Sequence, residues 1–298
     1  LQDRQGEAIH LGNLGSAYWS LGDAGRAGEY YRQALAITQE IGDRRNAGVH
    51  LGNLGNVAQA LGELSQAADC YRQGLALARE VGDRRGEGNR LANLAMIYAG
   101  TGEMQRAIDH YREALALARE TGDRRAEESR LGYLGLAHAD VGESRQAVAC
   151  FEQALAIARE LGDRQAEGLL LANLANACSD VGQPRQAVEH GTLALAIARE
   201  SCATSAAGSP EWAAGRRAER NALGSLGNAY TALGEAQHGV DRLEQALAIS
   251  REMGDRRGEA VSLGNLGDAW AARGDGRQAL AVHEQALAVA REAGAAAV

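Results

Sequence analysis

The pentapeptide Leu-Gly-Asn-Leu-Gly decides the fold, because it begins at Leu11 and returns unchanged at Leu51 and Leu263. Close variants lie between these copies. The seven copies begin at Leu11, Leu51, Leu91, Leu131, Leu171, Leu223 and Leu263. Successive copies are 40 residues apart, except for a step of 52 from Leu171 to Leu223. A fixed period of this length is typical of a solenoid, so we expect seven repeats and one insertion of 12 residues.

Each repeat predicts a pair of helices. In the third repeat, Leu91, Leu94 and Tyr98 follow the spacing of one helical face. A second apolar face surrounds Tyr111, and the pattern stops at Gly122. One helical hairpin cannot bury its own apolar face, whereas stacked hairpins can. The pattern therefore indicates a continuous core between stacked pairs.

The links between repeats carry helix-start signals. Asp123 follows Gly122 and is placed to cap the next helix, with Glu127 in its first turn near the positive end of the helix dipole. Pro184 falls near the start of a second helix, where its missing N–H costs little. The Arg-Arg pairs that begin helices, such as Arg84-Arg85, stand beside acidic residues, and we expect ion pairs there rather than sites.

Small and large residues occupy separate columns, where a column is the set of equivalent positions in successive repeats. Gly55 and Ala67 represent two small columns, and Tyr71 and Tyr98 represent two aromatic ones. Small side chains allow paired helices to approach closely, and the aromatic rings fill the remaining gaps. We therefore expect close helix contacts at the small columns.

Composition excludes several classes of protein. The chain has 298 residues, a net charge of −8 and only 4% aromatic residues, which argues against a β-rich fold and against a nucleic-acid backbone as partner. It has no apolar run of about 18 residues for a membrane span, and Leu1-Gln2-Asp3-Arg4 does not read as a signal peptide. The 4 cysteines lack paired spacing, which favours a reduced, cytoplasmic protein. Abundant Arg without Lys suggests a bacterial source.

The pattern Leu-x-x-Leu-Gly-x-x-Tyr…Ala-x-x-x-Tyr-x-x-Ala resembles the tetratricopeptide repeat, in a form longer than the usual period of 34. It is similar to Pins/LGN-type adaptors, kinesin light chains and arrays of bacterial signalling proteins. The resemblance implies an all-α, right-handed superhelical solenoid over residues 1–298. The expected repeats are 4–42, 43–82, 83–122, 123–162, 163–202, 215–254 and 255–294, with an insertion at 203–214.

The resemblance also implies a peptide ligand along the concave surface, which the first helix of each pair lines. Asparagine recurs there between the two leucines and three residues later, so two columns form one polar face. A carboxamide both donates and accepts hydrogen bonds, and it suits the main chain of an extended peptide. The alternatives are that Asn solvates an exposed face, that it bonds a neighbouring helix, or that repeat duplication copied it. The expected site residues are Asn13, Asn53, Asn56, Asn89, Asn93, Tyr133, Asn173, Asn176, Asn228, Asn265 and Asp268.

The middle of this face is more apolar. Tyr133 replaces Asn there, beside Met96 and Leu136, which suggests an anchor for a hydrophobic ligand side chain, with drift in one repeat as the alternative. Arg90 and Arg130 stand one residue off the inward column, and we do not expect them to clamp a terminal carboxylate.

Neither a metal site nor catalysis is expected. The column of Cys70, His110, Cys150 and His190 has zinc-ligand residue types, but stacked helices lie about 8–10 Å apart, so these four cannot converge on one ion. No phosphate loop or nucleophile elbow appears. We therefore expect no cofactor and no enzymatic activity.

The insertion at 203–214 has the composition of a loop. It is interpreted as a tolerated surface loop, with a hinge or a partner contact through Trp212 as alternatives. Cys202 is expected to be exposed, and Gly215 stands where the capping Asp normally lies.

The sequence thus predicts a protein-interaction scaffold that binds a partner peptide, as part of a larger bacterial signalling or defence protein. The main alternative is end-to-end self-assembly into dimers or filaments, because Leu1 begins within a link and Ala297-Val298 directly follows the last helix. An enzyme on a solenoid scaffold is a further alternative for which the sequence offers no candidate residue.

Overall fold

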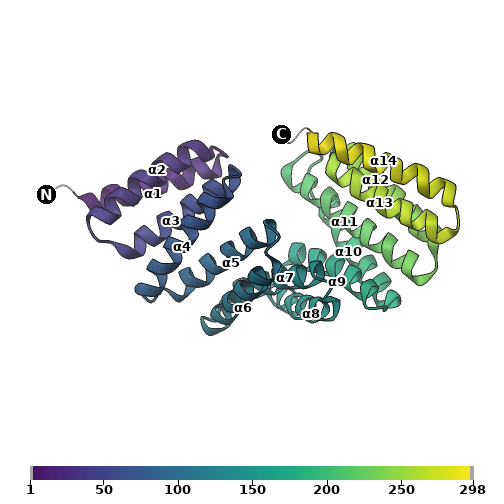
Figure 1. Ribbon diagram of the computed structural model, residues 1–298, viewed down its shortest axis with the longest axis horizontal. Coiled ribbons are helices and arrows are strands. Elements are labelled where there is room, and N and C mark those ends of the chain that lie inside the picture. The colour runs from purple at the N-terminus through teal and green to yellow at the C-terminus, as the bar shows by residue number, and fades with distance from the viewer. Residues whose placement is uncertain (1–2, 296–298) are drawn as a thin grey trace. The chain divides into compact units, whose positions relative to one another are not determined.

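The computed structural model describes residues 3–295, and all regular structure in that range is α-helical. Consecutive helices pair as antiparallel hairpins (Figure 1). The expected all-α helical repeat fold is confirmed. The helices are α1 (Arg4–Ser20), α2 (Ala24–Glu40), α3 (Arg44–Ala60), α4 (Leu64–Glu80), α5 (Arg84–Gly100), α6 (Met104–Glu120), α7 (Arg124–Asp140), α8 (Ser144–Leu161), α9 (Arg164–Asp180), α10 (Pro184–Thr204), α11 (Pro210–Leu233), α12 (Ala236–Glu252), α13 (Arg256–Arg273) and α14 (Gly276–Ala295).

The chain divides into two compact units, Leu1–Ala137 and His138–Val298, called here the N-terminal and C-terminal units. The boundary lies within α7 and not at the insertion. A single continuous solenoid over residues 1–298 stays a prediction. Leu1, Ala297 and Val298, on which the expectation of uncapped ends depends, lie outside the described residues.

The turns form as their Gly-Asp sequence predicts. Gly122 has φ of 66°, a left-handed conformation that glycine adopts without steric cost. The Asp123 carboxylate then accepts a hydrogen bond from the backbone N–H of Ala126 at 3.0 Å, which confirms the predicted cap. Pro184 begins α10 as expected.

Close helix approach occurs at the small columns. A Cβ added to Gly55 on α3 would lie 2.3 Å from the Tyr71 ring of α4. A Cβ added to Gly227 on α11 would lie 2.6 Å from the side chain of Leu243 on α12. Tyr71 and Leu243 are both completely buried. Glycine therefore allows each large side chain to lie directly against the backbone of the paired helix.

A column of buried glutamates joins successive repeats. On α5, the Glu87 carboxylate accepts hydrogen bonds from Arg79 of α4 at 2.8 Å and from Arg84 of α5 at 2.9 Å. Arg84 also donates to Glu120 of α6 at 2.6 Å, so the ion pairs tie three helices together. Burial of such a carboxylate is tolerated because both of its oxygens are paired. The equivalent buried residues are Glu127, Glu167, Glu219 and Glu259.

The interpretation of 203–214 as a loop is wrong. Ala203 and Thr204 extend α10, α11 begins at Pro210, and only residues 205–209 lie outside the helices. The Ala-rich segment favours helix, and the Ser209 hydroxyl accepts a hydrogen bond from the backbone N–H of Trp212 at 3.1 Å. Serine at the cap and proline at the first helical position thus start α11 early.

The side chains of this segment pack against the repeats. Trp212 is half-buried, with the Arg216 guanidinium 5.8 Å from its ring centroid. Cys202 was expected to be exposed, but it is half-buried because it packs on Gly215. The segment therefore lengthens one hairpin and does not project from it.

Candidate functional site

Three first helices of the C-terminal unit, α9, α11 and α13, line an open groove of about 340 Å³. These helices run from teal (α9) through green (α11) to yellow-green (α13) in Figure 1. Contacts of α11 with both α9 and α13 place the three helices side by side. The groove is large enough for several residues of a ligand chain.

Four of the expected site residues line this groove, namely Asn173 and Asn176 of α9, Asn228 of α11 and Asn265 of α13. Their side chains are exposed or half-buried. Among the described residues, none of these four carboxamides has a recorded hydrogen bond to another protein group. Each therefore presents unused donors and an acceptor to the groove.

The charges in the groove are unequal. Arg220 of α11 forms an ion pair with Asp255, and it also donates to Asn221 at 2.9 Å. The hydrogen bond from the backbone N–H of Gly258, and then Arg220, hold the pKa of Asp255 below its usual range. Arg257 is exposed and lines the groove, and no ion pair is recorded for it among residues 3–295. Within the described part of the chain, Arg257 is thus a groove cation without a counter-ion.

The groove is open at Gly224 because one residue column changes along the chain. In the N-terminal unit this column holds Arg90, whose guanidinium covers Gly52 so closely that a Cβ there would lie 2.1 Å from its Cζ. In α13 the same column holds Ser262, which is too short to cover Gly224 on α11. A Cβ added to Gly224 would meet no atom within 4 Å. The helix backbone at Gly224 is therefore open to the groove.

Several asparagines of the N-terminal unit are occupied by the protein itself. Asn56 accepts a hydrogen bond from the Tyr71 hydroxyl at 2.8 Å and another from the Asn93 carboxamide at 3.3 Å. Burial raises the pKa of Tyr71 to about 12, so this hydroxyl remains a donor at neutral pH. For Asn56 and Asn93, these bonds agree with the alternative that Asn bonds a neighbouring helix.

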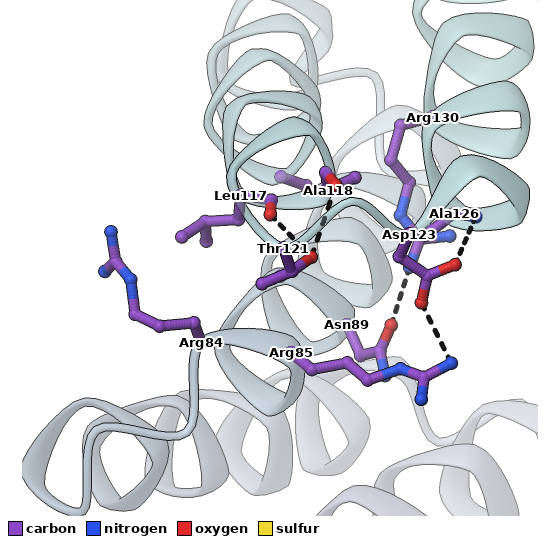
Figure 2. Close-up of a pocket in the computed structure, with 11 residues that line it drawn as sticks. Arg84, Arg85, Asn89, Leu117, Ala118, Thr121, Asp123, Ala126 and Arg130 are labelled. Atoms are coloured by element: carbon purple, nitrogen blue, oxygen red, sulfur yellow. Dashed lines mark hydrogen bonds and ion pairs between the residues drawn. The ribbon is translucent and has the colours of Figure 1, made fainter.

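Asn89 is also bonded within the protein. Figure 2 shows its carboxamide and the Arg130 guanidinium pointing toward each other, and Arg130 donates to the Asn89 oxygen at 2.8 Å. Nearby, Arg85 pairs with Asp123 at 2.9 Å. The space left between them is about 10 Å³, room for about one water molecule. The side chains of this unit therefore fill the region that is open in the C-terminal unit.

The remaining expected residues do not line the groove. The Tyr133 ring stacks on Tyr111 with centroids 5.8 Å apart, and it stays partly exposed. Asn13 is exposed and Asn53 is half-buried. Asp268 is exposed, with a carboxylate oxygen 3.6 Å from a ring nitrogen of His283.

The part of the chain that the structure describes holds neither a metal-binding cluster nor a membrane span. Among residues 3–295, no group of three or more His, Cys, Asp or Glu side chains could hold a metal ion. No helix in the same range is long and apolar enough to cross a membrane.

The sequence reasoning missed the residues that make the groove unlike the rest of the chain. Arg257 was treated as one of many Arg residues in surface ion pairs. The column directly before the first Leu of each repeat changes from Arg90 and Arg130 to Ser262, and this change from a long to a short side chain could be read from the sequence. Without the side-chain placement, nothing showed that this column covers the glycines of the preceding first helix.

Comparison with known proteins gives the family and the fold. A family model of the tetratricopeptide repeat matches residues 6–80, 52–120, 87–160, 126–200 and 219–292. No curated protein matches the chain. Among solved structures, the apo form of RapI is 12% identical with a TM-score of 0.79, and the match covers 97% of this chain and 99% of RapI.

Two further structures are similar. A Rap protein complexed with competence and sporulation factor is 14% identical, with a TM-score of 0.66 and coverage of 96% of this chain and 75% of that one. A signal transduction ATPase with numerous domains from Pyrococcus horikoshii, which has a tetratricopeptide repeat sensor, is 13% identical with a TM-score of 0.74. This match covers 97% of our chain and 43% of the ATPase. At these identities the similarity shows the fold alone.

Proposed function

Since this chain belongs to the tetratricopeptide repeat family, we propose that it is a protein-interaction scaffold that holds an extended peptide segment of a partner in the groove of α9, α11 and α13. The observation that carries the proposal is the set of four groove carboxamides that have no hydrogen-bond partner among residues 3–295. They line a single groove, whereas Asn56, Asn89 and Asn93 are bonded within the protein.

The groove suits a main chain better than a compact molecule. An extended peptide presents an N–H and a C=O at every residue, and carboxamides on adjacent helices can bind both groups. Each such hydrogen bond contributes about 0.5–1.5 kcal/mol net. Asn173 and Asn228 together would then account for about 1–3 kcal/mol, which corresponds to roughly 5- to 150-fold in Kd.

The test begins with selection of binding peptides from a random display library on the immobilised chain. The Kd of a selected peptide is then measured by calorimetry for the parent and for Asn173→Ala/Asn228→Ala. The matched control is Asn13→Ala/Asn53→Ala, which removes the same residue type from the same column in the N-terminal unit. Weakened binding in the first variant alone supports the proposal. Equal affinity in all three proteins would contradict it.

The cellular context is proposed from the similar structures. The Pyrococcus horikoshii protein has repeats that form the sensor of a signal transduction ATPase, and a Rap protein was solved with a bound factor. On this basis the chain is the ligand-sensing part of a larger signalling or defence protein of the bacterial cytoplasm, without a cofactor or catalysis of its own. Partners captured from a bacterial lysate should compete with the selected peptide; capture that the peptide does not affect would count against this context.

Self-association is a second candidate, favoured by the outer faces of α1 and α14. Leu14 on α1 is 44% exposed, although Leu54 in the same column is buried. Leu280 and Leu287 on α14 are exposed, although Val240 and Leu247, which occupy the same two columns in α12, are buried. A second copy would cover both faces by stacking end to end. Light scattering over a range of concentrations should show mass growth that Leu287→Glu abolishes, whereas a constant monomer mass would exclude this candidate.

A further inference from the structure

The geometry points to a specific ligand chemistry for the groove of α9, α11 and α13: an extended peptide with a carboxylate side chain opposite Arg257 and an aliphatic side chain opposite Val261. This inference rests on the proposed function, because it specifies the ligand of the same site.

Charge gives the first argument. The whole chain carries a net charge of −8, but the charged side chains that line the groove are Arg220, Arg257 and Asp255. Arg220 and Asp255 neutralise each other, so Arg257 leaves the groove with a local positive charge. An anionic group is therefore the complementary ligand feature at this point of an otherwise acidic protein.

Spacing gives the second argument. Arg257 and Val261 are four residues apart near the start of α13, so their Cβ atoms lie about 5–6 Å apart on one helix face. In an extended peptide, residues i and i+2 point to the same side and are about 6.6 Å apart. A carboxylate and an aliphatic side chain at i and i+2 can therefore reach both residues together. Leu169 of α9 adds a second exposed aliphatic side chain to the groove.

The floor of the groove gives the third argument. Glycine in a helix interior is unfavourable by about 1 kcal/mol relative to alanine, and no neighbouring atom requires glycine at position 224. Because nothing covers the helix there, a ligand main chain can approach closely at Gly224. Close approach brings that main chain within reach of the carboxamides of Asn173 and Asn228.

The probes are two pools of fluorescein-labelled heptapeptides. Both pools have valine at the third position and are random elsewhere, except that the fifth position is glutamate in one pool and glutamine in the other. Retention on the immobilised chain is measured by fluorescence. The glutamate pool should be retained about two- to fivefold more strongly, as expected for a partly exposed ion pair. The preference should fall as salt concentration rises.

Three variants locate the effect. Arg257→Gln should reduce retention of the glutamate pool to the level of the glutamine pool. Arg217→Gln, which changes the same column in α11 outside the groove lining, should leave the preference intact. Gly224→Leu should abolish retention of both pools by filling the groove. Its matched control is Gly264→Leu, because Gly264 also has open space around it but does not line the groove.

The outcomes separate the two proposals. Equal retention of both pools, or a preference that Arg257→Gln does not reduce, would overturn the inference about the ligand. If Gly224→Leu still blocked binding in that case, the proposed groove would stand. If Gly224→Leu bound both pools as the parent does, the groove would not be the site, and the proposed function and the inference would both fail. Melting curves of each variant confirm that it is folded.

Discussion

Replacing Gly224 by alanine should stabilise the C-terminal unit, whereas the same replacement three residues later, at Gly227, should destabilise it. Both glycines lie within α11, so their helix propensities are comparable. They differ in their surroundings. A Cβ at Gly224 would meet open space, and a Cβ at Gly227 would lie 2.6 Å from Leu243 Cγ and 3.1 Å from the Gly239 carbonyl oxygen.

The magnitudes follow from these distances. Alanine at position 224 gains up to about 1 kcal/mol from helix propensity and a smaller unfolded-state entropy. At position 227 the same gain is outweighed by overpacking, which costs about 1–3 kcal/mol because the added Cβ overlaps the completely buried side chain of Leu243. We expect a net loss of about 1–2 kcal/mol there. For a unit of this size, 1 kcal/mol corresponds to a shift in Tm of about 2–4 °C.

The assay is thermal and urea unfolding followed by circular dichroism. Transition midpoints are compared because a repeat array does not always unfold in one step. A higher midpoint for Gly224→Ala together with a lower one for Gly227→Ala agrees with the reasoning. A loss of stability in Gly224→Ala as large as that in Gly227→Ala would show that Gly224 is packed, and the open groove floor would be refuted.

Two further predictions concern buried groups. The hydrogen bond from Arg251, and then that from Arg256, hold the pKa of Glu259 below its usual range. Its stabilisation is therefore complete above the usual glutamate pKa and is lost as the pH falls through the lower pKa of the folded state. At pH 7, Glu259→Gln should lower the free energy of unfolding measured in urea by about 1–2 kcal/mol relative to the parent. This difference should shrink between about pH 5 and pH 3. A difference that stays constant with pH would contradict its origin in the ion pairs. Burial raises the pKa of both the Cys178 and the Cys202 thiols, but Cys178 is buried and Cys202 is only half-buried. Cys178 should therefore react with a thiol-reactive dye only as the protein unfolds, more slowly than Cys202, which peptide mapping of the labelled sites would reveal.

The helices, turns and core columns could be predicted from the sequence because they depend on neighbours close in the chain. Asp123 caps its helix through a residue three positions later, and Gly55 and Tyr71 face each other within one hairpin. Repetition of the same pattern strengthened each inference. The helical hairpins followed from these local rules, and the family followed from the resemblance of the repeat pattern to the tetratricopeptide repeat.

The state of the asparagine face could not be predicted, because it depends on contacts between repeats. Asn89 is occupied by Arg130, which lies 41 residues later in the chain. The same column carries Leu170, Ala222 and Ser262 in the C-terminal unit, and the short side chain of Ser262 leaves the space above Gly224 open. The loop interpretation of the insertion was wrong because its Gly and Pro were given more weight than its helix-forming alanines.

The most direct test of the groove as a peptide site is a crystal structure of the chain with a selected peptide bound. The account predicts an extended peptide over Gly224, with main-chain groups bonded to the carboxamides of Asn173 and Asn228. A peptide bound at the outer face of α1 or α14, with the groove filled only by solvent, would contradict it.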